Sequence, residues 1–239
     1  MSANFEELDY RPTPIGALSL RRRHDLSLGV DIFEIKLGEQ FLMSSLFTAS
    51  EVALSELALA MLPATDLEVV VGGLGLGYTA HTALQNDSVK SLIVVEALDA
   101  VVDWHRTGLL PLGNVLASDR RCRFVVGDFF KLVLSPEGLD PEEKFRRFDA
   151  ILVDIDHSPE FLLAPDNAAF YQPAGLKSVT RHLHPGGVFG LWSNELPDER
   201  FTARLSEVFL EVRAERVTFH NPYLNANFTQ TIYLARTAA

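Results

Sequence analysis

The sequence is short of cysteine, of basic residues and of long apolar runs, and each shortage excludes a class of protein. Cys122 is the only cysteine in 239 residues, so no intrachain disulfide and no cysteine-based zinc site can form. Lysine and arginine number 21 against 32 acidic residues, which gives a net charge of −11. Because binding to nucleic acid generally requires cations that neutralise phosphates, this balance predicts no nucleic-acid partner.

Apolar runs are also too short for a membrane protein. No run approaches the ~20 residues that a helix needs to cross a bilayer. The start, MSANFEELDYRP, is polar and acidic and lacks the basic flank and apolar stretch of a secretion signal. These features predict a cytoplasmic protein without a membrane partner. Hydrophobic residues make up 47% of the chain, enough for one large domain or one domain with a small appendage.

The first part of the chain differs in pattern from the rest. Short, partly alternating apolar runs lie between residues 15 and 47, namely IGALSLRRRHD, VDIFEIKL and QFLMSSL. Such runs are typical of an antiparallel hairpin or a three-stranded sheet. We interpret Arg21 to Arg23 as a solvated sheet edge that blocks pairing with another sheet. The sequence thus predicts a small β unit over residues 1–47 and a second domain over residues 48–239.

From residue 48 the pattern becomes that of an α/β domain. TASEVALSELALAMLP has helical spacing, with Thr48 or Ser50 as candidate caps. Strand-like runs then follow, LEVVVGG, SLIVVEA, CRFVVGD, FDAILVD and GVFGLWS, separated by the helical stretches YTAHTALQN, LDAVVDWHRTGLLP, AAFYQPAGLKSVTRHL and PDERFTARLSEVFLEV. This alternation predicts a mostly parallel sheet with helices on both faces. The last runs, RVTFHNPY and FTQTIYLAR, predict a closing antiparallel hairpin.

The first predicted strand of this domain runs into a glycine-rich loop, Gly72-Gly73-Leu74-Gly75-Leu76-Gly77. In open α/β sheets, ligands bind at the carboxyl ends of the strands. Glycines allow a sharp turn and a close approach of the backbone to a ligand. The spacing of Gly73, Gly75 and Gly77 departs from the dinucleotide fingerprint G-x-G-x-x-G, so the loop alone does not identify a nucleotide site.

Polar residues follow the second and third strands of this domain. Glu96 lies about 20 residues after the glycines, where a carboxylate can accept both hydroxyls of a ribose. Asp128 could bind the edge of an adenine, and Phe129 could pack on the ring. Without a ligand, Glu96 would be an acidic residue near a helix cap, and Asp128 would be an ordinary helix N-cap. We favour the ligand interpretation of both because of the glycines that precede them.

The fourth and fifth strands end in further charged residues. Asp154, Asp156 and His157 fall within four residues. Charged groups clustered at a strand end cost free energy unless they form ion pairs or take part in function. The alternative to a functional site is that these residues form a solvated acidic loop that caps a helix. After the fifth strand, Glu195 could face a cationic acceptor, or it could be a rim carboxylate beside a packed Trp192.

Together these motifs resemble the class I S-adenosylmethionine-dependent methyltransferase fold, which is Rossmann-like, and within it the spermidine synthase (polyamine aminopropyltransferase) family. The resemblance covers most of the chain. VVVGGLGLG is similar to the nucleotide loop, VVEA to the acidic strand end, VVGDFF to the adenine-binding step and ILVDIDHSP to the catalytic loop. HNPYLNANFTQTIYLA resembles the segment whose Pro-Tyr pair lines the acceptor side, which points to Tyr223.

The resemblance implies roles for these residues. Contacts to S-adenosylmethionine or its decarboxylated form would come from Gly73, Gly75, Gly77, Glu96 and Asp128. Asp154 would be the catalytic carboxylate, Asp156 would orient a small-molecule acceptor, and His157 could be an alternative base. No metal is expected. As in many members of the family, a homodimer could form, here through the apolar residues Phe41, Leu42 and Met43.

The departures from the family pattern bear on the reaction. Spermidine synthases usually carry an Asp inside the glycine loop that binds the amine end of the decarboxylated nucleotide, and Gly75 stands there instead. TASEVAL replaces the usual Tyr-His pair, and His157 stands where the second catalytic Asp is expected. These changes favour methyl transfer from S-adenosylmethionine to a small acceptor. Aminopropyl transfer and a non-catalytic nucleotide-binding homologue are the alternatives.

Overall fold

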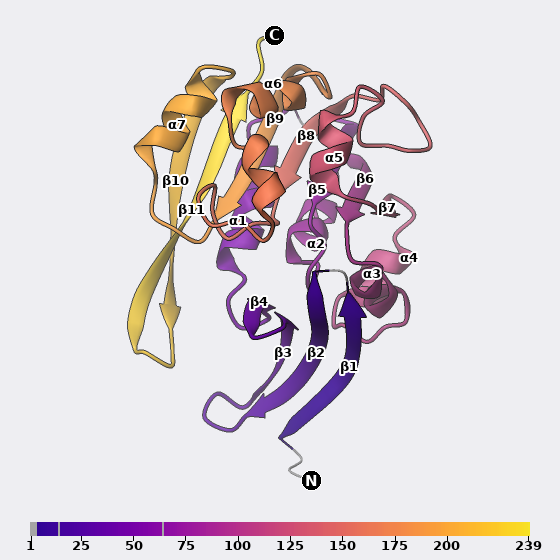
Figure 1. Ribbon diagram of the computed structural model, residues 1–239, viewed down its shortest axis with the longest axis vertical. Coiled ribbons are helices and arrows are strands. Elements are labelled where there is room, and N and C mark those ends of the chain that lie inside the picture. The colour runs from indigo at the N-terminus through magenta and orange to yellow at the C-terminus, as the bar shows by residue number, and fades with distance from the viewer. Residues whose placement is uncertain (1–3, 14, 64) are drawn as a thin grey trace.

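The structure is a computed structural model that describes residues 4–13, 15–63 and 65–239. In this part of the chain, eleven strands form two sheets, one of four strands and one of seven. We call them the N-terminal sheet and the central sheet. Figure 1 shows the N-terminal sheet below the central sheet, in indigo and purple. Residues 1–3 and 14 of the predicted β unit lie outside the described residues.

The N-terminal sheet is larger than predicted. Its order is β1-β2-β3-β4, all antiparallel, with β1 at Phe5–Thr13, β2 at Gly16–Asp25, β3 at Val30–Leu37 and β4 at Gln40–Ser44. The sequence missed β1 because FEELDYRPT has no regular apolar alternation and contains Pro12, which an edge strand tolerates. The edge interpretation of Arg21 to Arg23 is wrong, because β2 lies between β1 and β3.

The central sheet has the predicted class, mostly parallel and closed by an antiparallel hairpin. Its order is β10-β11-β9-β8-β5-β6-β7, and β5 to β9 pair in parallel. The bounds are Leu67–Gly72 for β5, Val89–Glu96 for β6, Cys122–Val126 for β7, Phe148–Val153 for β8, Leu183–Ser193 for β9, Leu210–Asn221 for β10 and Ala226–Arg236 for β11. In Figure 1 the β10–β11 hairpin reaches down to the level of the N-terminal sheet.

Helices cover both faces of the central sheet and agree only in part with the prediction. Their bounds are Ala49–Leu59 for α1, Tyr78–Leu84 for α2, Asp99–Arg106 for α3, Gly113–Ser118 for α4, Phe129–Leu134 for α5, Pro173–Thr180 for α6 and Glu199–Ser206 for α7. The stretch around AAFYQP is divided into a 3₁₀ turn at Pro165–Ala169 and α6, because a proline favours the first turn of a helix. The sequence missed α4 and α5, which are six residues each.

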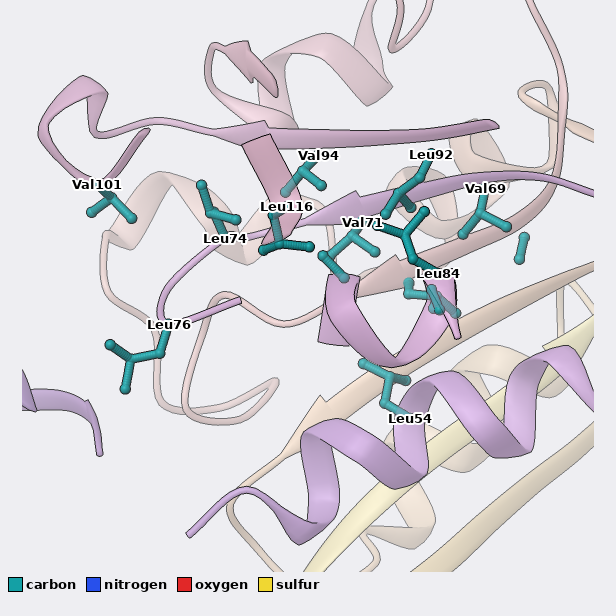
Figure 2. Close-up of a cluster of buried hydrophobic side chains, with 14 of the residues drawn as sticks. Leu54, Val69, Val71, Leu74, Leu76, Leu84, Leu92, Val94, Val101 and Leu116 are labelled. Carbon is teal, nitrogen blue, oxygen red and sulfur yellow. The ribbon is translucent and has the colours of Figure 1, made fainter. Parts of the chain in front are cut away.

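Alternate residues of each parallel strand enter two separate cores. In β5, Val69 and Val71 pack with α1 to α4, whereas Val70 packs with α5 to α7 on the other face. This follows from the strand period of two. Leu74 and Leu76, from the glycine loop, belong to the first core together with Val71 (Figure 2). The two leucines therefore anchor the loop in the core, and the glycines determine the shape of its exposed side.

The boundary predicted at residue 47 falls between β4 and α1 and stays a prediction. Thr48 occupies the N-cap position of α1, although its side chain makes no capping hydrogen bond.

Candidate functional site

A cavity of about 590 Å³ lies between the carboxyl edge of the central sheet and the N-terminal sheet. The chain moves from β5 to β6 and β7 on one side, then returns to β8 on the other side of β5. This is the switch point where open α/β sheets bind ligands. The ends of β5 and β8 are joined there, because the N–H of Asp154 donates to the carbonyl of Gly72 at 2.8 Å.

The glycine loop needs its glycines for conformation and for space. Gly73 has φ +94°, and a side chain there would overlap the backbone carbonyl of Asp154. Gly75 has φ +48°, and a side chain there would overlap the sulfur of Met43. Both line the cavity, whereas Gly77 is the N-cap of α2 and does not. Gly77 therefore shapes the loop, and its predicted contact with the nucleotide does not fit this position.

The N-terminal sheet reaches this loop through Met43. The N–H of Leu76 points to Met43 Sδ at 2.8 Å, and Met43 itself lines the cavity. Phe41 and Leu42 line it as well, so all three residues assigned to a homodimer surface contribute to the cavity, and 53% of Phe41 is also exposed. The homodimer itself stays a prediction.

Glu96 is buried at the end of β6 and lines the cavity. Its two carboxylate oxygens accept the N–H groups of Leu74 and Leu98, each at 2.9 Å. Burial raises the pKa of this carboxyl, and these backbone donors oppose the rise. The N–H groups of Gly75 and Ala97 also lower the pKa of this carboxyl, so Glu96 is surrounded by backbone donors and holds the glycine loop in place.

Asp128 is the N-cap of α5, one of the two roles that the sequence left open, and its contact with adenine stays a prediction. Its carboxylate caps α5 by accepting the N–H of Lys131 at 3.1 Å, and it also lines the cavity. Phe129 lines the cavity too, but its buried ring packs edge-to-face against Phe130 and Phe170 in the core. The structure thus brings Glu96, Asp128 and Phe129 to one wall.

Asp154 shares the cavity with a second carboxylate, Glu51 of α1. Asp154 accepts a hydrogen bond from Thr79 Oγ1 at 2.8 Å, and Glu51 accepts one from Ser50 Oγ at 2.8 Å. Burial raises the pKa of both carboxyls, and the charge of Asp154 raises that of Glu51 further. Two such neighbours do not ionise together easily, so the pair can hold one proton near neutral pH.

Sequence reasoning missed Glu51. Its signal was its place in the helix: Glu51 precedes Leu54 and Ala58 by three and seven positions, on the buried stripe of α1. Only 6% of Glu51 is exposed. A carboxylate on a buried stripe is costly without a partner or a task, and this pattern is readable without a structure.

Asp156 does not reach the cavity, and the prediction that it orients an acceptor does not fit its position. It is 2% exposed and is absent from the cavity walls in the described residues. Its carboxylate accepts hydrogen bonds from the N–H of Leu163 at 2.7 Å, from Asn167 Nδ2 at 3.0 Å and from Tyr171 OH at 2.8 Å. Asp156 therefore fixes the loop that follows β8.

His157 lines the cavity beside the N-terminal sheet. Its Nε2 lies 2.8 Å from Gln40 Nε2, and its ring stacks on Phe161 with the centroids 5.0 Å apart. Burial lowers the pKa of His157, which favours the neutral ring near pH 7. Because the Gln40 amide is the donor, it occupies the lone pair that His157 would use as a base.

The two residues predicted on the acceptor side differ in position. Tyr223, in the turn between β10 and β11, lines the cavity. Its hydroxyl accepts a hydrogen bond from Arg23 at 2.8 Å and donates one to Asp25 at 2.6 Å. Glu195 is exposed and does not line the cavity, so the role of facing the acceptor does not fit it. Asn194 and Trp192 form that wall instead.

Two further features of the described residues bear on partners. Every helix in this part of the chain is too short or too polar to span a bilayer. No three histidine, cysteine, aspartate or glutamate side chains within it are grouped so that they could hold a metal ion.

Comparisons with known proteins agree with this geometry. No family model matches the chain. It is 29% identical over 132 residues to putrescine N-methyltransferase 2 from Nicotiana attenuata, a match that covers 55% of this chain and 32% of that protein. The chain thus spans about a third of the length of that relative.

Two solved structures match almost the whole chain. A spermidine synthase from Thermotoga maritima has a TM-score of 0.74 at 17% identity, over 97% of this chain and 73% of its own. A spermidine synthase in complex with the transition state analogue AdoDATO has a TM-score of 0.74 at 18% identity, over 97% and 74%. The chain therefore has the spermidine synthase-like form of the class I methyltransferase fold.

Proposed function

We propose that the chain is a transferase that binds S-adenosylmethionine in the cavity and moves its methyl group to a small amine. The nucleotide part rests on three strand ends that meet at one wall. Gly73 follows β5, Glu96 ends β6 and Asp128 follows β7, and all three line the cavity. We assign Glu96 to the ribose, which an acidic residue at this strand end binds in nucleotide-binding α/β folds, and Asp128 to the adenine edge. The structural neighbour with AdoDATO supports an S-adenosyl nucleotide here.

The contact between Gly75 and Met43 is the observation that favours methyl transfer. A side chain at position 75 would overlap the Met43 sulfur, so the loop carboxylate that is usual in spermidine synthases would have to displace this thioether. That carboxylate would bind the amine of decarboxylated S-adenosylmethionine and repel the α-carboxylate of S-adenosylmethionine. A glycine covered by a thioether leaves the loop neutral. The relative named as a putrescine N-methyltransferase supports the same reaction.

Asp154 is the residue that we assign to the proton transfer. An amine attacks only when it is unprotonated, so a nearby carboxylate must accept its proton. The amine nitrogen then attacks the methyl carbon, the new C–N bond forms as the C–S bond breaks, and S-adenosylhomocysteine leaves. Burial raises the pKa of Asp154, which makes it a stronger base than an exposed aspartate. Holding the two reactants in line can contribute ~7–11 kcal/mol to catalysis.

Aminopropyl transfer is the second candidate, and the pair Glu51–Asp154 favours it. Both carboxylates line the cavity, and Asp154 lies directly beside the glycine loop. If they face the methionine end of the nucleotide, they attract the ammonium of the decarboxylated form and repel an α-carboxylate. The structural likeness to spermidine synthases also supports this reaction.

Calorimetric binding of four nucleotides separates the candidates. S-adenosylmethionine and S-adenosylhomocysteine carry the α-carboxylate, whereas decarboxylated S-adenosylmethionine and methylthioadenosine do not. We expect the carboxylated pair to bind at least about tenfold more tightly, and the reverse preference would establish aminopropyl transfer instead. Binding of none of the four would support a non-catalytic protein. Variant Gly75→Asp should weaken binding of the carboxylated pair, and Gly186→Asp, in an open turn with φ +76°, is the control for backbone strain.

A further inference from the structure

One backbone N–H of the glycine loop has an unusual partner. Within residues 73–77, every N–H group except that of Leu76 faces an oxygen atom, either of a backbone carbonyl or of the Glu96 carboxylate. The N–H of Leu76 points instead to Met43 Sδ at 2.8 Å. A thioether is a weak acceptor, and a methionine side chain is flexible. Because Met43 lines the cavity, an anionic group of a ligand can take the place of its sulfur.

The carbonyl of the same peptide group, which belongs to Gly75, is held by His105 of α3. The Nε2 atom of His105 lies 2.9 Å from this oxygen, and since a carbonyl only accepts, Nε2 carries the proton and donates. His105 is fully buried and is absent from the cavity walls in the described residues. The C=O and N–H of a trans peptide group point in opposite directions. The hydrogen bond from His105 therefore turns the Leu76 N–H toward the cavity.

The ring of His105 is fixed in this role. Its Nδ1 is buried and has no hydrogen-bond partner in the part of the chain that the structure describes. Protonation there would create a buried cation, and burial lowers the pKa of His105 to about 4. The ring packs against Phe124 with the centroids 5.9 Å apart, and a side chain at Gly77 would overlap it. At neutral pH, His105 is therefore a neutral donor through Nε2 in a fixed position.

We infer that His105 is a positioning residue that makes the glycine loop selective for a nucleotide with an α-carboxylate. This inference rests on the proposed binding of S-adenosylmethionine. In the observed orientation, the loop offers the Leu76 N–H, and the α-carboxylate accepts this hydrogen bond in place of Met43 Sδ. If the peptide group turned over, the Gly75 carbonyl would face the cavity and repel the α-carboxylate, but not the decarboxylated nucleotide. His105 thus determines which of the two nucleotides the loop favours.

Two nucleotides that differ only in the α-carboxylate, S-adenosylhomocysteine and its decarboxylated form, test the inference by calorimetry. In the native chain, we expect the carboxylated form to bind at least about tenfold more tightly. His105→Phe keeps a ring but removes the donor, so this ratio should fall about tenfold, while the affinity for the decarboxylated form should stay within about threefold. His105→Gln, whose amide can donate to the same carbonyl, should restore the ratio. A merely structural role would weaken binding of both forms alike.

His182 offers the matched control. It is a buried histidine whose Nε2 lies 2.9 Å from the carbonyl of Val133, which belongs to the second core, and it does not line the cavity. His182→Phe should lower stability and leave the ratio unchanged. An unchanged ratio in folded His105→Phe overturns the inference and leaves the proposed function standing. Binding of neither form to the native chain, or preference for the decarboxylated form, refutes the proposed methyl transfer as well.

NMR of the native chain covers the case in which His105→Phe does not fold. Long-range proton–nitrogen spectra of the histidine rings should show His105 at neutral pH as the neutral tautomer with the proton on Nε2. Addition of S-adenosylhomocysteine should shift the Leu76 amide proton downfield, because a carboxylate is a stronger acceptor than a thioether. The decarboxylated form should not produce this shift. A proton on Nδ1 of His105, or equal shifts with both nucleotides, overturns the inference.

Discussion

The two sides of the cavity are built in different ways. The nucleotide side consists of local units, in which a strand of the central sheet runs into a loop and then a helix. Gly73, Glu96, Asp128 and Asp154 each stand directly at or after the end of a strand. The acceptor side joins segments that are distant in the sequence, such as β2 with the β10–β11 turn through Arg23 and Tyr223. The geometry of the nucleotide side therefore depends mainly on local structure, whereas that of the acceptor side depends on tertiary packing.

The largest expected effect comes from Asp154→Asn, because it removes the carboxylate to which we assign the proton transfer. General-base catalysis contributes about 10²–10⁴-fold, and kcat should fall by that factor. Binding of S-adenosylhomocysteine, measured by calorimetry, should change little. Asp156→Asn is the comparison: its carboxylate holds a loop behind the cavity, so its main effect should be on thermal stability. Loss of nucleotide binding in Asp154→Asn would contradict the assigned division of roles.

The next effect tests how rigid the nucleotide side is. Gly73→Ala forces a side chain into the carbonyl of Asp154 at φ +94°, so β5 and β8 must separate at their ends. We expect the free energy of unfolding to fall by about 3 kcal/mol or more, with loss of nucleotide binding. Gly186→Ala is the control, because it has φ +76° and no atom within 4 Å. Gly186→Ala should lower the free energy of unfolding by about 1 kcal/mol, from backbone strain alone. If denaturant unfolding shows the same loss of free energy in both variants, the close approach of Gly73 to the Asp154 carbonyl adds nothing to the cost.

The same difference explains what the sequence could predict. Strand ends and glycine loops are local patterns, so the sequence predicted the parallel sheet, and it also singled out Gly73, Glu96 and Asp128, which line the cavity. Asp154 and Asp156 were both assigned to the cavity because they follow the same strand end within three residues. However, β8 ends at Val153, and the chain then turns Asp156 into the interior. The pairing of Glu51 with Asp154, and of Met43 with Gly75, depends on tertiary packing that no local pattern encodes.

A smaller effect, with a defined pH dependence, is expected from Glu51→Gln. Burial and Asp154 raise the folded-state pKa of Glu51 above its unfolded value, so the folded state retains a proton that the unfolded state releases. Stability is therefore highest below the unfolded pKa of about 4.3 and falls as pH rises toward the folded pKa. Glutamine removes this loss. We compare the free energy of unfolding of Glu51→Gln with that of the native chain by denaturant unfolding at pH 4 and at pH 8. The variant should be more stable relative to the native chain at pH 8 than at pH 4, by on the order of 1 kcal/mol.

The Glu51 experiment has a matched control on the same helix. Glu56 belongs to α1 but lies on its exposed side, so Glu56→Gln should leave the pH dependence of unfolding as it is in the native chain. A parallel pH dependence in native chain and Glu51→Gln would show that Glu51 ionises in the folded state as easily as in the unfolded state. The carboxylate pair would then hold no proton near neutral pH, and Asp154 alone would serve the acceptor amine.

The smallest expected effect is on the acceptor side, from Tyr223→Phe. The change removes the hydroxyl that links the β10–β11 turn to Arg23 and Asp25, while the ring is kept over the guanidinium. Tyr223 is 46% exposed, so the loss of stability should stay below about 1 kcal/mol. The acceptor KM should rise several-fold, because this wall of the cavity loosens, and the affinity for S-adenosylhomocysteine should not change. Leu224→Ala, in the same turn and 65% exposed, should alter neither value. A change in nucleotide affinity would show that the two sides of the cavity are coupled through the hairpin.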